Sequence, residues 1–254
     1  MLLAVDVGNT NIVVGVFDGE RLVADYRLHT DDRTTGDELG LTVTDLLQRS
    51  AITPADVHAV VVSNVMPPLR RAIDTMAHAY FKREPLVLGP GTRTGLRIQY
   101  DDPRQVGADR IANAIAVRHL YGVPAVLVDF GTATTFDALG ADGEYRGGAI
   151  APGMQISHDA LVAHAAMLRR VELAAPASAV GHNTTTSMQA GLVYGYVGLV
   201  EGLVARIRKA IGTHAKVVAT GGIAADLADL ITAIDVVDER LTLTGLRLIY
   251  ELNH

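Results

Sequence analysis

The sequence predicts an α/β protein made of two domains of similar topology, with a ligand cleft between them. The two halves of the chain open with the same pattern, and apolar strands alternate with helical segments in both halves. In addition, 49% of the 254 residues are hydrophobic, which is enough to form two compact cores. We place the two predicted domains at residues 1–118 and 119–254.

An internal repeat is the clearest feature of the chain. The segments LLAVDVGNTNIVVGVFDGERLVADYRL, in the first half, and AVLVDFGTATTFDALGADGEYRGGAI, in the second, share one order of residues. Each has an apolar strand, an aspartate, one apolar residue, a glycine, and then hydroxyl or amide residues. Each copy next reaches an Asp-Gly pair, at 18–19 and at 142–143, which is typical of a type I′ β-hairpin.

Helices and strands alternate through the rest of the first half. Asp37 is a candidate N-cap for a helix with an apolar stripe, and a buried strand follows at 58–65. Pro67 and Pro68 then start a second helix. The apolar positions of the two helices are Leu39, Val43, Leu46 and Leu47 in the first, and Leu69, Ile73, Met76 and Tyr80 in the second.

The second half repeats this alternation. We expect a long helix at about 186–211, a strand at 216–220, a short helix after Gly222, a strand near Val236 and a terminal helix through Leu246. The long helix has four glycines along one face, each of which costs about 1 kcal/mol relative to alanine. Close helix contact, either within the fold or across a dimer, would offset that cost. These glycines are Gly191, Gly195, Gly198 and Gly202.

Composition and charge exclude several classes of function. The chain has no cysteine, so disulfides, thiolate metal sites and a thiol nucleophile are all excluded. Its net charge of -6 provides no basic surface for nucleic acid. We see neither a secretory signal nor an apolar stretch that approaches the roughly 20 residues needed to cross a bilayer. We therefore expect a cytoplasmic protein without a nucleic-acid or membrane partner.

Two acidic turns carry the main chemical signal. Asp6 precedes Gly8 in the first copy of the repeat, and Asp129 precedes Gly131 in the second. A glycine after a buried strand lets successive backbone N–H groups surround an anion, and a carboxylate beside a polyphosphate is favourable when a hard cation such as Mg²⁺ lies between them. A single turn of this kind could be an ordinary hairpin, whereas two copies in register favour a nucleotide site. No GxxxxGK[ST] motif is present, and GPGTRTG at 89–95 is interpreted as a loop.

A third aspartate lies where a helix begins, in the segment QVGADRIANAIAVRHLYG. Asp109 could be the N-cap of this helix, or it could be a general base that accepts the proton of an attacking hydroxyl group. Arg110 could donate to a substrate carboxylate or phosphate, or it could be a surface charge. The sequence pattern alone leaves both pairs of interpretations open.

The motifs DVGNTN, GADR, DFGTATT and GGAIAPG occur in the order seen in type III pantothenate kinases, and the chain resembles this family over essentially its whole length. The resemblance implies duplicated ribonuclease H-like domains of the actin/hexokinase/Hsp70-like superfamily, with ATP in the cleft between them. It also implies a homodimer that phosphorylates pantothenate with ATP, the first step of coenzyme A biosynthesis.

The resemblance also implies roles for individual residues. Asp109 would be the catalytic base, Asp6 would hold Mg²⁺, and Asp129 would bind a monovalent cation, K⁺ or NH₄⁺. The ATP-binding residues would be Asp6, Val7, Gly8, Asn9, Thr10, Asn11, Ile12, Val13 and Thr132. The pantothenate-binding residues would be Tyr100, Gly107, Ala108, Asp109, Arg110 and Thr184, the last from the neighbouring subunit.

Two alternatives stay open at this point. A regulatory protein that resembles the Bvg accessory factor would share the fold without needing the base, although this chain retains Asp109, Arg110 and both acidic turns. Another small-molecule kinase of the superfamily, acting on a sugar or on acetate, would differ mainly in the pocket around residues 100–110.

Overall fold

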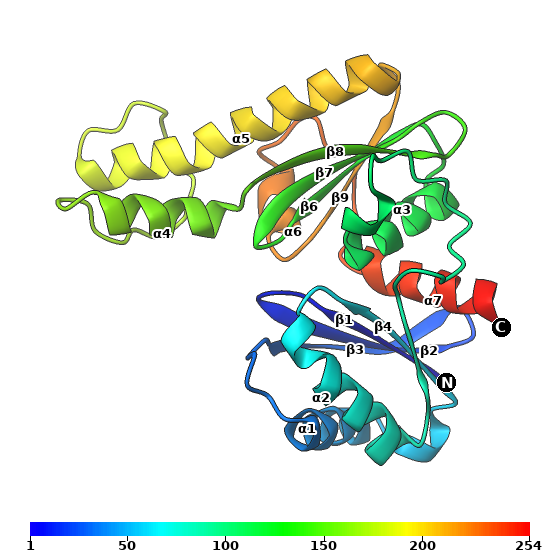
Figure 1. Ribbon diagram of the computed structural model, residues 1–254. Coiled ribbons are helices and arrows are strands. Elements are labelled where there is room, and N and C mark those ends of the chain that lie inside the picture. The colour runs from blue at the N-terminus through cyan, green and yellow to red at the C-terminus, as the bar shows by residue number, and fades with distance from the viewer. The chain divides into compact units, whose positions relative to one another are not determined.

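A computed structural model describes all 254 residues, and the chain divides into two units (Figure 1). Unit 1 contains Met1–Leu120 together with Arg240–His254, and unit 2 contains Tyr121–Glu239. The first division falls close to the predicted boundary. The C-terminal segment, however, does not belong with the rest of 119–254 as predicted, because its helix α7 (Leu241–Asn253) packs against α3 (Ala108–Leu120) and against the sheet of unit 1.

Unit 1 is built on a five-stranded sheet in the order β3-β2-β1-β4-β5. β1, β2 and β3 are antiparallel neighbours, whereas β4 and β5 run parallel to β1. One face packs against α1 (Gly36–Arg49) and α2 (Arg70–Thr75), and α3 and α7 lie on the other (Figure 1). The strands are β1 Leu2–Val7, β2 Asn11–Asp18, β3 Arg21–His29, β4 Ala59–Asn64 and β5 Pro85–Val87.

Unit 2 has the same strand order, β10-β9-β6-β7-β8. Its helices α5 (Thr184–Ile211) and α6 (Ala224–Ala228) share one apolar core with the sheet, and α4 (Met154–His164) packs beside α5. β6 to β10 therefore correspond in order to β1 to β5, which confirms the duplication predicted from the repeat. The strands are β6 Ala125–Phe130, β7 Ala133–Leu139, β8 Tyr145–Pro152, β9 Lys216–Thr220 and β10 Val236–Val237.

The helix starts show where local sequence rules apply. The N-cap of α1 is Thr35, not Asp37 as predicted, because the Thr35 hydroxyl accepts the backbone N–H of Glu38 while the Glu38 carboxylate accepts that of Thr35. Asp37 lies in the first turn instead. The helix predicted after Pro67 is divided into a 3₁₀ turn, α2 and a π-helical segment, Met76–Phe81.

Neither repeat turn is the predicted type I′ hairpin. The β2–β3 loop consists of Gly19 and Glu20, and only Gly19 has a positive φ, of 60°, whereas type I′ needs positive φ at both central residues. The β7–β8 connection is longer, because Leu139 pairs with Tyr145. Glycine at the first central position fits a type II′ turn in the first copy.

Helix α5 is long and apolar enough to cross a membrane by length and composition alone, which the sequence analysis did not predict. In the structure Tyr196, Val200 and Val204 belong to the core of unit 2, and the C-terminal part of the helix carries Arg206 and Arg208. A helix with one face buried against a sheet and charges in its C-terminal part is typical of a helix that packs on the core of a globular domain. Its N-terminal part runs beside α4, away from the sheet (Figure 1).

Candidate active site

The first acidic turn lies at the carboxyl end of β1. The Asp6 backbone is in register with Val13 of β2 and with Ser63 of β4. The chain then turns through Gly8, whose N–H donates to the Asn11 carbonyl at 3.0 Å, while the Thr30 hydroxyl donates to the Gly8 carbonyl at 2.8 Å. These bonds hold the turn in one conformation and leave Asn9 and Thr10 exposed at its tip.

The second acidic turn has the same construction in unit 2. Asp129 of β6 is in register with Thr135 of β7 and Thr220 of β9, the positions equivalent to Val13 and Ser63 in unit 1. Thr132 is exposed in the turn, and its carbonyl accepts the N–H of Gly153 at 3.2 Å. A Cβ at Gly153 would come within 2.4 Å of that carbonyl oxygen, so glycine there keeps the second turn in place.

A buried hydroxyl group accompanies each acidic residue. Ser63 Oγ, beside Asp6 in register, and Thr135 Oγ1, beside Asp129, are both buried and have no hydrogen-bond partner in the chain. Side chains of residues that pair across neighbouring strands lie on the same face of a sheet. A buried hydroxyl group normally finds a partner, and a hard cation or its bound water prefers such oxygen atoms. The donor sets at both turns therefore fit cations.

The charged groups at the turns are few. No group of three or more histidine, aspartate or glutamate side chains gathers anywhere in the structure in a way that could hold a metal ion. An all-protein cage of the kind that binds zinc or calcium is therefore not what these turns provide. One carboxylate together with substrate phosphates is the arrangement in which Mg²⁺ is usually bound.

The GADR segment begins helix α3. The helix starts at Ala108, and Asp109 lies in its first turn with its Oδ1 accepting the Arg110 N–H at 2.7 Å. Asp109 is thus inside the helix and not at the N-cap position that was one of its two interpretations. Burial raises the pKa of the Asp109 carboxyl, and the N–H and guanidinium of Arg110 oppose this rise. A raised pKa makes the carboxylate a better proton acceptor.

Arg110 is not a surface charge. It is only 7% exposed. A buried guanidinium in the first turn of a helix is costly unless it meets an anion or hydrogen-bond acceptors, and it presents several donors in one plane. The burial excludes the surface charge, and the binding role of Arg110 stays a prediction.

A cavity of about 520 Å³ lies within unit 1. Gly107 and Ala108 of the GADR segment form part of its wall, and Asn64 and Val65, at the end of β4, form another part. The Val65 N–H donates to the carbonyl of Val7 at 3.0 Å, so this wall adjoins the first acidic turn. The cavity thus adjoins the first acidic turn through Val65 and the GADR segment through Gly107 and Ala108, whereas residues 6–13, Asp109 and Arg110 do not line it.

The other predicted site residues lie elsewhere. Tyr100 is 37% exposed and does not line the cavity. Thr132 and Asp129 belong to unit 2, as does Thr184, an exposed residue that starts α5 after the N-cap Asn183. Their roles stay predictions.

Most of the cavity wall was not among the predicted site residues, including three polar residues. Asn64, Thr92 and Thr94 all line it, the last two from the segment GPGTRTG, which is a loop as predicted. The signal that could have identified Asn64 is its position at the end of a buried strand, three residues before Pro67, where an asparagine often forms a turn with its own backbone.

Comparison with known proteins gives a family match and solved structures of the same fold. The family model described as type III pantothenate kinase matches residues 2–206. The type III pantothenate kinase of Myxococcus xanthus is 53% identical over 254 residues, which is 100% of this chain and 99% of the relative.

Two solved structures show the same fold at low identity. The first is a Campylobacter jejuni protein assigned to the Baf family of transcriptional activators, with TM-score 0.64, 20% identity and coverage of 99% of this chain and 98% of that one. The second is a Sinorhizobium meliloti protein assigned as a 2-dehydro-3-deoxygalactonokinase, with TM-score 0.60, 12% identity and coverage of 99% and 96%. The fold is that of the actin/hexokinase-like kinases, and with the match of sequence over its full length the chain belongs to the type III pantothenate kinase family.

Proposed function

We propose that this protein carries out the reaction that names its family, transfer of the γ-phosphoryl group of ATP to the primary hydroxyl group of pantothenate. The product is 4′-phosphopantothenate, and the reaction opens coenzyme A biosynthesis. The observation that carries the proposal is the cavity of unit 1, whose wall includes Gly107 and Ala108 of the GADR segment and adjoins the first acidic turn through Val65. The family match over residues 2–206 supports the choice of substrate.

Asp109 acts as the general base in this proposal. Phosphoryl transfer needs an acceptor hydroxyl that loses its proton as it meets the γ-phosphorus atom, and the protein contributes mainly positioning and charge. The raised pKa of Asp109 suits a proton acceptor, since a stronger base takes the hydroxyl proton more readily. Arg110 would hold an anionic group of pantothenate, together with Gly107 and Ala108.

The two acidic turns bind ATP and its cations in this proposal. The backbone of the first turn, from Asp6 to Val13, and Thr132 of the second would hold the phosphates. Asp6 would hold Mg²⁺, which neutralises charge on the phosphates when it is bound. Asp129 would hold the monovalent cation, with Thr135 Oγ1 as a nearby oxygen donor, and such a cation offsets negative charge in the same way.

We also propose a homodimer located in the cytoplasm, with no nucleic-acid or membrane partner. A Cβ added at Gly191, Gly195 or Gly198 of α5 would meet no atom of this chain within 4 Å. Packing within one copy therefore does not explain these glycines, and contact with a second copy would. Thr184, at the start of the same helix, would then reach the substrate of the neighbouring subunit.

An assay that couples ADP release to a spectroscopic signal tests the reaction. Purified protein is given ATP and Mg²⁺ with pantothenate, with acetate or with a panel of sugars, in buffers containing potassium, ammonium or sodium. We expect ADP release only with pantothenate, and faster release in potassium or ammonium than in sodium. No pantothenate-dependent ADP in any of these buffers would rule out the proposed reaction, and equal rates in all three would rule out the monovalent cation.

A further inference from the structure

Asn64 presents an amide group of known orientation at the wall of the cavity. Its Oδ1 accepts the backbone N–H of Met66 at 2.8 Å. A backbone N–H can only donate, so the oxygen of the amide must face Met66 and the NH₂ group must occupy the other position. The Nδ2 atom has no hydrogen-bond partner within the chain. Asn64 therefore offers donor capacity that the protein itself does not use.

Two threonines of the opposite loop are arranged in the same way. Thr92 Oγ1 accepts the N–H of Gly89 at 3.2 Å, and Thr94 Oγ1 accepts the N–H of Leu96 at 3.3 Å. In each case a backbone N–H of the same loop occupies an acceptor position of the side chain, and the hydroxyl proton remains to be donated. Asn64, Thr92 and Thr94 thus each have a hydrogen-bond donor available for a ligand in the cavity.

The charges at the cavity also favour a ligand that accepts hydrogen bonds. No aspartate or glutamate lines it, and Arg104 is its one charged lining residue. The Arg104 Nε lies 2.9 Å from Asp102 Oδ1, in an exposed ion pair. The positive charge of Arg104 therefore lies at the rim of the cavity and not in its interior. A cavity that offers donors and lacks carboxylates favours a ligand rich in carbonyl and carboxylate oxygen atoms.

We propose that Asn64 is a specificity-determining residue that donates a hydrogen bond from its amide NH₂ group to a carbonyl or carboxylate oxygen of the acceptor substrate. This inference rests on the proposed function, in which that substrate is pantothenate, a molecule with both kinds of oxygen. An analogue without the oxygen would leave the amide donor unpaired in the closed site. Such a loss discriminates more strongly than a missing methylene group.

The variant Asn64→Asp tests the proposal. Aspartate keeps the oxygen that accepts the Met66 N–H and replaces the NH₂ donor by an anionic acceptor, so the local turn is retained while the interaction is reversed. Gln48→Glu, on the exposed surface of α1, adds the same charge to unit 1 away from the cavity and is the matched control. Isothermal titration calorimetry measures pantothenate binding to wild type and both variants in the presence of a non-hydrolysable ATP analogue.

We expect Asn64→Asp to weaken pantothenate binding about tenfold or more, with binding of the ATP analogue unchanged and Gln48→Glu equal to wild type. In steady-state assays the loss appears as a higher KM. Wild-type affinity in Asn64→Asp would overturn the role of Asn64 while leaving the proposed function intact. A wild-type protein that binds no pantothenate would overturn both.

A second measurement follows pantothenate binding to the wild-type protein and uses the variant only to assign one signal. In wild-type protein labelled with ¹⁵N-asparagine, the side-chain NH₂ signal of Asn64 is the one that disappears in Asn64→Asp. We expect this signal to shift when pantothenate is added and to stay in place when the ATP analogue alone is added. A signal that pantothenate leaves unmoved would contradict the proposed contact.

Discussion

Burial and local donors decide the chemistry of single residues in this protein. At Asp109 burial raises the pKa, although a backbone N–H and the neighbouring guanidinium of Arg110 favour the charged form. The carboxyl is therefore a stronger base than an exposed aspartate, and it follows directly on Ala108, which lines the cavity.

We predict that Asp109→Asn abolishes turnover and largely spares ATP binding, because the amide cannot accept the hydroxyl proton. In wild type, kcat/KM should fall as pH decreases through the raised pKa of Asp109, since only the ionised form is a base. Rates from the ADP assay across pH, with ATP affinity from calorimetry, check both statements. Near-normal turnover by Asp109→Asn would remove Asp109 as the base.

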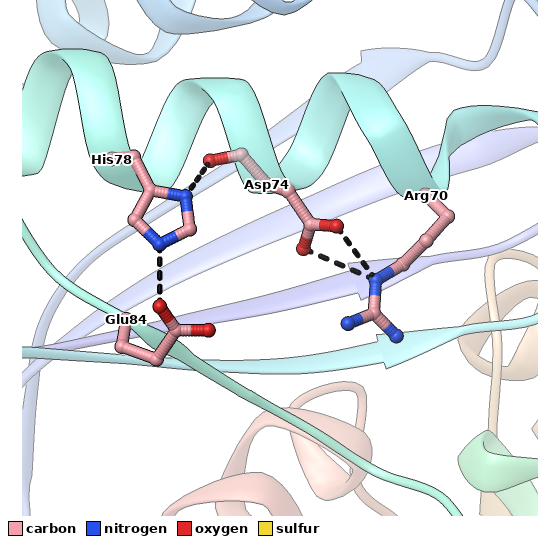
Figure 2. A network of polar contacts seen from close by, with 4 residues as sticks. All are labelled: Arg70, Asp74, His78 and Glu84. Atoms are coloured by element: carbon pink, nitrogen blue, oxygen red, sulfur yellow. Dashed lines mark hydrogen bonds and ion pairs between the residues drawn. The ribbon is translucent and has the colours of Figure 1, made fainter.

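A second titrating group lies far along the chain from the GADR segment, in the surface network of unit 1 (Figure 2). His78 Nδ1 lies 2.8 Å from the Asp74 carbonyl, and Nε2 lies 2.5 Å from Glu84 Oε2. Both partners are acceptors, so this arrangement favours the protonated ring, in which both nitrogens donate. The bond to Glu84 raises the pKa of His78. Arg70 donates to both oxygens of the Asp74 carboxylate from the preceding turn.

The raised pKa of His78 predicts how the stability of the protein depends on pH. A histidine whose pKa is higher in the folded state adds stability below its unfolded pKa of about 6.5, and the contribution disappears as pH rises through the folded value. Glu84→Gln should therefore lower the melting temperature at pH 5.5 and have little effect at pH 9. Asp45→Asn, which breaks an exposed ion pair with Arg49 that contains no histidine, should have the same effect at both pH values. A pH-independent effect of Glu84→Gln would contradict the assignment.

At the scale of elements, the contact between α3 and α7 holds the helix that carries the GADR segment. The Thr242 hydroxyl of α7 donates to Asn113 Oδ1 of α3 at 2.7 Å, and Asn113 is fully buried. A Cβ at Gly245 would lie 2.0 Å from the backbone oxygen of Ala112. The two helices therefore approach so closely that only glycine fits at this position.

We predict that Gly245→Val destabilises the protein by about 3 kcal/mol, because backbone atoms of α3 cannot move away as a flexible side chain could. Leu252→Val is the control, since it places valine in the same helix at an exposed position, where a substitution changes stability by about 0.5 kcal/mol or less. Urea unfolding followed by circular dichroism measures both. Equal midpoints for Gly245→Val and wild type would mean that α7 does not press on α3 as closely as the structure shows.

At the scale of the whole molecule, the exposed glycines of α5 make the proposed dimer testable. We predict that Gly195→Arg yields a folded monomer, because a Cβ at this exposed position meets nothing within 4 Å in one copy, whereas arginine would separate two helices that pack closely. Ala225→Arg, at an exposed position of α6, is the matched change and should leave the oligomeric state unchanged. Light scattering after size-exclusion chromatography gives the masses. A monomeric wild type, or a dimeric Gly195→Arg, would exclude this interface.

Local patterns were sufficient for most of the fold. The repeated Asp-x-Gly turns predicted the duplication, and the structure places Asp6 and Asp129 at equivalent register positions of two sheets with equivalent strand order. The sequence also contained the signal for the correct N-cap of α1, since Thr35 and Glu38 have the spacing of a capping box. Strand and helix periods, turn residues and caps depend on neighbours in sequence, which is why the chain itself reports them.

The sequence by itself thus determined the duplicated α/β fold, the two acidic turns and the GADR segment. Only the tertiary structure decided that α7 joins unit 1, that Arg110 is buried, and that the end of β4 and a glycine-rich loop form a cavity with the GADR segment. The physical reason is that burial, a raised pKa and an amide of fixed orientation depend on groups distant in the chain, and no short window of sequence contains both partners.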